Sequence, residues 1–164
     1  MEYRLAEKKD IAPVCKIISS AIAEMERNNI YQWDEVYPAK EDFLSDMGFG
    51  QLYVGTKEGE VAVLYTINKD TDEQYANGTW KYPNSEFRVI HRLCVNPAFQ
   101  NRGVAGETIK HIERELKASG VETIRLDVFT ENPFALSLYR KNGYYEVGTA
   151  DWRKGRFLLM EKHL

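Results

Sequence analysis

The feature that most constrains the fold is the stretch of residues 100–107, which reads Gln-Asn-Arg-Gly-Val-Ala-Gly-Glu. It joins a predicted strand, residues 87–95, to a predicted helix, residues 105–118. A helix N-terminus leaves backbone N–H groups without partners and carries positive dipole charge, so it stabilises an anion. Gly103 and Gly106 let the backbone turn sharply and approach a ligand closely. The stretch predicts a strand–turn–helix unit that binds a phosphate ester; a turn with glycines for geometry alone is the alternative.

Two common phosphate motifs do not fit this stretch. A P-loop has Lys and then Ser or Thr after its last glycine, whereas Glu107 and Thr108 follow Gly106. The dinucleotide fingerprint has glycines at its first, third and sixth positions, and counting from Gly103 the third and sixth are Ala105 and Thr108. Both mismatches argue against a nucleotide-binding domain.

The pattern that remains is Gln-x-x-Gly-x-Ala at residues 100–105, after a strand that ends in Leu-Cys-Val at residues 93–95. It resembles the pyrophosphate-binding motif of the GNAT superfamily of acyl-CoA N-acyltransferases. Residues 132–135, Asn-Pro-Phe-Ala, followed by Leu-Tyr and Gly-Tyr, are similar to the family's second signature. Tyr144 stands where the family usually has Phe. The resemblance covers roughly residues 87–148.

Hydrophobic periodicity predicts the remaining elements. Apolar residues between Ile11 and Met25 recur at spacings of three and four, which predicts a helix that Asp10 can cap. Residues 52–67 read as a hairpin, and the strand–helix–strand order of residues 87–129 predicts a parallel βαβ unit. The expected fold is therefore α/β (α+β): a mixed, mostly antiparallel central sheet with a parallel βαβ cofactor-binding core, of GNAT type. With 164 residues, the chain suits one domain, residues 1–164.

Composition excludes several classes of function. Hydrophobic residues make up 43% and charged residues 29%, and no apolar run approaches the ~20 residues of a membrane span. The N-terminus lacks a secretory signal, so we expect a cytoplasmic protein. The net charge is −3 and the chain has no block of Lys and Arg, which argues against nucleic-acid binding. The three histidines are scattered without the spacing of metal ligands, so we expect no metal site. Cys15 and Cys94 are expected to be buried thiols.

The resemblance implies acetyl-CoA or CoA as the bound molecule. Backbone groups of Leu93, Cys94 and Val95 would hold the pantetheine arm. Asn132 would bond the cofactor or, alternatively, only cap its helix, and Ala135 belongs to the same motif. Arg102 would pair with a phosphate or be solvated. Backbone amides would hold the pyrophosphate along Gln100, Asn101, Arg102, Gly103, Val104, Ala105 and Gly106.

The resemblance also singles out Tyr139 as the general acid. Acyl transfer releases a thiolate whose conjugate acid has a pKa of about 8.5, and a phenol with a pKa near about 10 can return a proton to it. The alternative role for Tyr139 is core packing, because Ala135 and Leu138 lie on the same predicted helix face.

The general base and the acceptor pocket stay open at this stage. An acceptor like lysine has a pKa near about 10.4 and must lose a proton before it attacks. The candidate bases are Glu24, Glu35, Glu86, His91 or an ordered water. Aromatic residues of two long segments either line the acceptor pocket or pin those segments to the core: Trp33, Tyr37, Tyr75, Trp80 and Tyr82.

The resulting hypothesis is an N-acetyltransferase that moves the acetyl group of acetyl-CoA to a primary amine by direct attack. The acceptor is expected to be a small-molecule or peptide amine, but the sequence does not identify it. The sequence also does not determine whether the protein forms a homodimer. The alternative is a catalytically silent CoA-binding sensor or interaction module.

Overall fold

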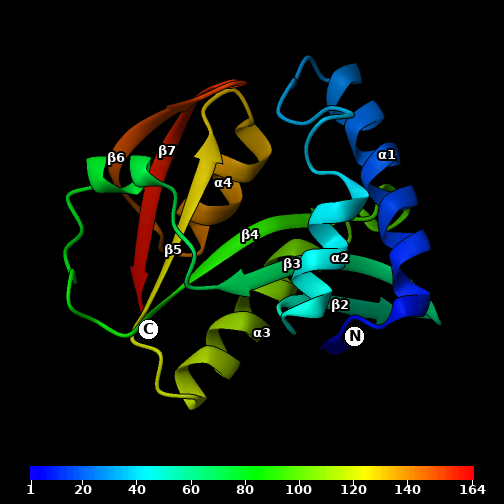
Figure 1. The fold of residues 1–164 in the computed structure, drawn as a ribbon, viewed down its shortest axis with the longest axis horizontal. Coiled ribbons are helices and arrows are strands. Elements are labelled where there is room, and N and C mark those ends of the chain that lie inside the picture. Colours follow the sequence, from blue (N-terminus) through cyan, green and yellow to red (C-terminus); the bar gives the residue numbers. More distant parts are fainter. The chain divides into compact units, whose positions relative to one another are not determined.

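The computed structural model describes residues 1–164, which divide into two compact units. Unit 1 comprises residues 1–67 and 92–108, and unit 2 comprises residues 68–91 and 109–164. Two elements, β4 (Phe87–Val95) and α3 (Val104–Ala118), run from one unit into the other (Figure 1). The expected single domain over residues 1–164 stays a prediction.

Unit 1 contains three antiparallel strands and two helices. Strand β1 (Glu2–Leu5) pairs with β2 (Leu52–Lys57), with Glu2 opposite Thr56, and β2 pairs with β3 (Glu60–Asn68), with Leu52 opposite Thr66. The helices are α1 (Ile11–Arg27) and α2 (Lys40–Gly48), and two short 3₁₀ helices are Lys8–Asp10 and Pro97–Phe99. The predicted helix and hairpin are therefore present.

The core of unit 1 forms where the apolar face of α1 meets the sheet. Val14 and Ile17 from α1 cluster with Leu52, Leu64 and Phe43, because residues three and four apart share one face of a helix. Asp10 departs from its expected role, since its side chain makes no capping bond to α1. Its carboxylate instead accepts bonds from both Arg4 terminal nitrogens, at 2.6 and 3.0 Å, and from the Glu7 amide.

Unit 2 contains the parallel pair and the C-terminal hairpin. Residues Phe87–Val89 of β4 lie parallel to Thr123–Arg125 of β5 (Thr123–Phe129). Strand β7 (Gly155–His163) is antiparallel to both β5 and β6 (Tyr145–Trp152), and α4 spans Pro133–Lys141. The sheet order is β1-β2-β3-β4-β5-β7-β6, so the predicted mixed, mostly antiparallel fold is confirmed.

Residues 69–86 form a long segment that packs within unit 2. It contains a 3₁₀ helix, Glu73–Asn77, whose Tyr75 clusters with Val89, Ala150 and Leu159. At Gly148 of β6 a Cβ atom would lie 2.8 Å from the carbonyl oxygen of Asn77, so glycine is required there for the close approach.

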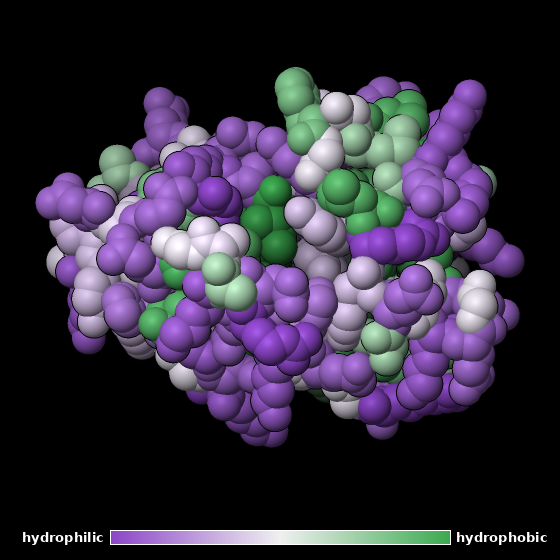
Figure 2. Space-filling model, turned by 90° about the horizontal axis from the view of Figure 1, so that it is seen from below, coloured by the Kyte–Doolittle hydropathy of each residue, from purple (hydrophilic) through white to green (hydrophobic).

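Charged and polar side chains cover most of the face in Figure 2, with hydrophobic side chains between them. None of the helices combines the length and the hydrophobicity that crossing a membrane requires.

Candidate cofactor and catalytic site

The predicted phosphate cradle, residues 100–106, lies in unit 1 between two buried anchors. Phe99 before it and Val104 within it cluster with Ala62 and Val63 of β3. The turn that leads into it is held by Asn96, whose Oδ1 accepts from the Ala98 amide at 3.1 Å and whose Nδ2 donates to the Val61 carbonyl at 3.0 Å. The exposed backbone of the cradle is therefore attached to the core at both sides.

The cradle takes its shape from two left-handed residues. Asn101 has φ +60° and Gly103 has φ +76°, and residues 100–103 are exposed. A Cβ on Gly103 would meet nothing within 4 Å, so the space in front of this backbone is open. Gly106 lies in the first turn of α3 without a positive φ, so its expected role in a sharp turn is wrong. The open space beside Gly106 still allows a ligand to approach.

Side chains around the cradle differ in exposure. The exposed Arg102 guanidinium lies over the Phe99 ring, at 5.6 Å from its centroid, and its pairing with a phosphate stays a prediction. Leu93 and Val95 are half-buried and Cys94 is buried. Burial raises the pKa of the Cys94 thiol to about 12, which leaves it protonated and a poor nucleophile. Cys15, which was expected to be buried, is half-buried.

In unit 2, Asn132 is the residue directly before α4. Its Oδ1 accepts a hydrogen bond from the Ala135 amide at 3.1 Å, and Pro133 takes the first helical position. This is the N-cap that the sequence offers as one of two roles for Asn132. Contact of Asn132 and Ala135 with the cofactor stays a prediction.

Tyr139 lies in the same helix and is 8% exposed. Its ring meets the ring of Tyr144 edge to face, with centroids 5.5 Å apart. Burial raises the pKa of Tyr139 above its ordinary value, and the negative charge of Asp127 raises it further. The hydroxyl therefore stays protonated well above neutral pH, as a proton donor must.

Asp127 of β5 is a functional candidate that the sequence reasoning missed. Its Oδ2 accepts a hydrogen bond of 2.7 Å from the Tyr75 hydroxyl, and its charge raises the pKa of both Tyr75 and Tyr139. The available signal was a lone acidic residue in the otherwise apolar run Leu126–Phe129, five residues before the Asn132 cap.

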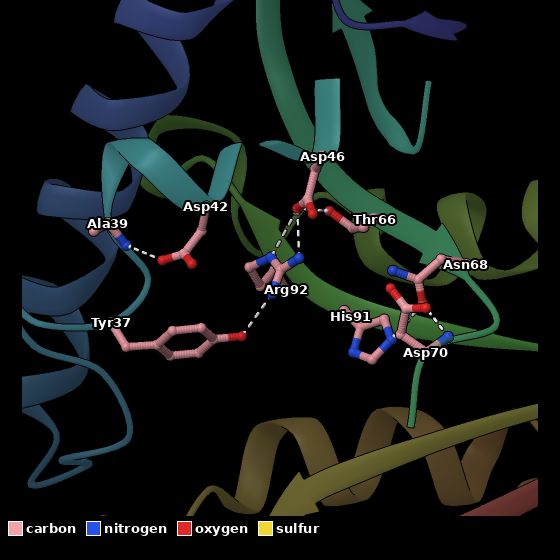
Figure 3. A network of polar contacts seen from close by, with 9 residues as sticks. All are labelled: Tyr37, Ala39, Asp42, Asp46, Thr66, Asn68, Asp70, His91 and Arg92. Atoms are coloured by element: carbon pink, nitrogen blue, oxygen red, sulfur yellow. Dashed lines mark hydrogen bonds and ion pairs between the residues drawn. The ribbon is translucent and has the colours of Figure 1, made fainter. Parts of the chain in front are cut away.

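The candidate bases have different environments. The amide N–H of Asp70 donates to Asn68 Oδ1, and His91 Nε2 lies 2.8 Å from the same oxygen (Figure 3). Because that oxygen can only accept, Nε2 carries the proton and Nδ1 is the basic nitrogen of neutral His91. Hydrogen bonds from Arg88 and Lys69 lower the pKa of Glu86, which makes it a weaker base. Glu24 pairs with Arg27, and Glu35 is exposed.

The aromatic candidates for the acceptor pocket separate into two groups. Trp33 packs against the core of unit 1, and Tyr75 and Trp80 pack within unit 2. Tyr37 and Tyr82 are each 40% exposed. For the first three residues the structure gives the core-packing role that the sequence offered as their alternative.

The chain matches the family model described as Acetyltransferase (GNAT) family over residues 21–144. The match covers more than half of the chain, and the protein belongs to this family. The expectation from the two sequence signatures is therefore confirmed.

Two curated relatives are bacterial. The chain is 35% identical over 59 residues to a [ribosomal protein bS18]-alanine N-acetyltransferase of Salmonella typhimurium, which covers 36% of this chain and 40% of the relative. It is 32% identical over 97 residues to the N-alpha-acetyltransferase RimI of Mycobacterium tuberculosis. This match covers 58% of this chain and 53% of the relative. The chain thus spans about half the length, or less, of the curated relatives it matches.

Solved structures share the fold over nearly the whole chain. An acetyltransferase of the GNAT family from Streptococcus agalactiae has a TM-score of 0.87 at 23% identity, covering 99% of this chain and 95% of the other. The Salmonella typhimurium protein yncA, described as a putative acetyltransferase, was solved with its cofactor acetyl-CoA. It has a TM-score of 0.67 at 14% identity, and the match covers 99% of this chain and 93% of yncA. No group of three or more His, Cys, Asp or Glu side chains in the structure could hold a metal ion.

Proposed function

We propose that the protein is an N-acetyltransferase that transfers the acetyl group of acetyl-CoA to a primary amine. The observation that carries the proposal is the exposed backbone of residues 100–103, directly before α3, in which Asn101 and Gly103 are left-handed. Such a backbone can offer several N–H groups to a pyrophosphate without a side chain in the way. Family membership and the acetyl-CoA found in yncA support the choice of ligand.

The residues of unit 2 suit the chemistry of the leaving group. The neutral amine nitrogen attacks the thioester carbon, the C–S bond breaks, and the sulfur accepts a proton that Tyr139 can donate. The proton that the nitrogen loses as it becomes an amide balances the one that Tyr139 gives up and restores the phenol. A phenol with a raised pKa is fully protonated at neutral pH, so each catalytic cycle begins with the proton in place. Direct attack needs no acyl-enzyme, and the buried Cys94 with its raised pKa is unsuited to form one.

Asp127 is the acidic group that we assign to the acceptor. Its negative charge adds to burial in raising the pKa of the Tyr139 phenol, and its Oδ2 accepts a hydrogen bond of 2.7 Å from the Tyr75 hydroxyl. A carboxylate attracts an ammonium group and can take its proton before the attack. The relatives' names include an alanine N-acetyltransferase of ribosomal protein bS18 and an N-alpha-acetyltransferase, so we propose peptides with a free N-terminal alanine as the first acceptors to test.

The test compares two tyrosines that form one aromatic pair. Tyr139→Phe should lower kcat by about 100-fold, as loss of a general acid typically does, without changing the Kd of acetyl-CoA. Tyr144→Phe, which removes a hydroxyl from the facing ring, is the matched control and should keep the parent kcat. Thiol release and peptide mass report the reaction, and calorimetry reports acetyl-CoA binding.

Three results would contradict the proposal. Absence of acetyl-CoA binding by the parent protein would remove the cofactor assignment. Binding without turnover on any amine would favour the silent CoA-binding module. Equal kcat for Tyr139→Phe and the parent would remove Tyr139 from the mechanism.

A further inference from the structure

Arg92 has a backbone conformation that its side chain does not favour. It lies inside β4 with φ +52°, whereas the other non-glycine residues with positive φ, Asn29, Glu58 and Asn101, lie in turns. A residue with a Cβ rarely adopts this left-handed conformation, and within a strand it changes the direction in which the next residues point. Some interaction must hold Arg92 in this state.

The side chain of Arg92 supplies that interaction (Figure 3). Its Nε and Nη2 donate to Asp46 Oδ2 at 3.0 and 2.5 Å, and its Nη1 donates to the Tyr37 hydroxyl at 2.7 Å. The same Asp46 oxygen accepts a bond of 2.7 Å from Thr66 Oγ1. The Arg92 and Asp46 side chains are 12% and 10% exposed, so the ion pair is largely shielded from water.

The partners of Arg92 come from three separate segments of unit 1. Asp46 lies in α2, Thr66 in β3, and Tyr37 in the connection between α1 and α2. The Asp34 carboxylate accepts from the amides of residues 36 and 37, and the Asp34 amide donates to the Tyr37 carbonyl, which closes a turn around Tyr37. The guanidinium is thus held from several sides, and so is the backbone that carries it.

The next three residues of β4 are Leu93, Cys94 and Val95. If the proposed function is correct, their backbone groups bind the pantetheine arm, and the φ value of Arg92 sets the direction in which they point. We propose that Arg92 is a positioning residue: its guanidinium, held by Asp46 and Tyr37, keeps β4 in the left-handed turn that directs the backbone of residues 93–95 towards acetyl-CoA.

The proposal separates what the side chain does from what the backbone does. A guanidinium that itself touched the cofactor could not be replaced by glycine. A guanidinium that only holds a left-handed backbone can be replaced by glycine, because glycine adopts positive φ without a steric penalty. The Arg92→Gly variant is therefore expected to bind acetyl-CoA better than Arg92→Ala.

The experiment measures the Kd of acetyl-CoA by calorimetry for full-length variants shown to be folded by circular dichroism. Arg92→Ala should bind at least about tenfold more weakly than the parent, and Arg92→Gly should stay within about threefold of it, a free-energy gap of order 1 kcal/mol. Arg4→Ala is the matched control. It removes another bidentate ion pair of unit 1, Arg4 with Asp10, at a residue without positive φ, so it should leave the Kd unchanged.

A second pair of variants keeps the test decisive if Arg92→Ala does not fold. Asp46→Asn keeps an oxygen acceptor but removes the charge, so it should weaken acetyl-CoA binding when Arg92 is present. Combined with Arg92→Gly, the same change should have little further effect, because the backbone no longer depends on the ion pair.

The outcomes separate this proposal from the proposed function. Equal Kd values for the parent and Arg92→Ala, equally weak binding by Arg92→Gly and Arg92→Ala, or an Asp46→Asn effect that persists with Arg92→Gly would each overturn the positioning role. Failure of the parent to bind acetyl-CoA would instead contradict the proposed function.

Discussion

The two units hold their functional segments by opposite means. In unit 1 the backbone of residues 100–103 is exposed, and ion pairs of Arg4 with Asp10 and of Arg92 with Asp46 hold other segments of the unit. In unit 2 the candidate acid Tyr139 is buried against Tyr144, and burial raises the pKa of both phenols. Backbone N–H groups must be exposed to reach an anion, whereas removal from water keeps a phenol protonated. We infer that acetyl-CoA binding depends on residues of unit 1 and proton donation on a residue of unit 2.

The largest effect should follow from blocking the cradle. Gly103→Val puts a branched side chain into the open space in front of the backbone that we propose binds phosphate, so CoA should bind at least about 100-fold more weakly, a loss of ~2.7 kcal/mol. Gly120→Val is the control, because Gly120 also has positive φ and open space but lies in the turn after α3, in unit 2. Calorimetry should show CoA affinity lost in the first variant and kept in the second. Equal losses would mean that strain, and not the cradle, is responsible.

A smaller effect is expected in how the stability of the protein depends on pH, with Asp10 of unit 1 acting at acidic pH. Hydrogen bonds from Arg4 lower the pKa of Asp10 in the folded protein. This contact therefore stabilises the fold at pH values above the unfolded pKa of about 4, and the stabilisation is lost as pH falls through the folded pKa. Asp10→Asn should cost about 2 kcal/mol at pH 7, and urea unfolding should show that the difference from the parent shrinks at acidic pH. A difference independent of pH would contradict the ionic origin.

In the same urea-unfolding experiments, alkaline pH should lower the stability of the protein through the buried tyrosines of unit 2. The pKa values of Tyr139 and Tyr144 are raised, so stability is kept below about pH 10 and falls above it, where unfolded tyrosines ionise more readily. Tyr144→Phe should make this alkaline loss shallower and leave the acidic behaviour unchanged.

The smallest effect should distinguish two helix caps. Asn96 in unit 1 and Asn132 in unit 2 each accept a bond from a backbone amide at 3.1 Å. Asn132→Ala should lower stability by about 1 kcal/mol through loss of the cap, and Asn96→Ala by a similar amount. If Asn132 also bonds the cofactor, only its variant should bind CoA more weakly at a temperature where both are folded. Unchanged CoA affinity would leave Asn132 as a cap alone.

Local patterns in the sequence predicted the local structure. The strand Phe87–Val95, the turn into α3, and the cap of α4 by Asn132 depend on residues that are close in sequence. Chemistry built from distant residues was not predictable in this way. The Tyr75–Asp127 bond joins residues 52 positions apart, and the Arg92–Tyr37 bond joins residues 55 positions apart. Hydrophobic periodicity does not reveal which distant residues bond to each other. An arginine in a predicted strand also gives no indication of a left-handed backbone.

Asp10 shows how a local rule can fail. Its type and position predict a helix cap, but Arg4 of β1, six residues earlier in the chain, offers a stronger, charge-assisted partner. The helix still begins at Ile11, since the apolar face of α1 determines its packing.

The contact at Gly148 limits how the protein can evolve. The carbonyl of Asn77 lies against this glycine, the Asn77 amide group donates to Thr149, and the amide of Thr79 donates to Val147. Residues 69–86 can therefore change sequence and length at their exposed positions, but their alignment with β6 is fixed at this point. Any mutation that adds a side chain at Gly148 has to be accompanied by a shift of the Asn77–Gly78 backbone, so the segment and the strand are expected to diversify together.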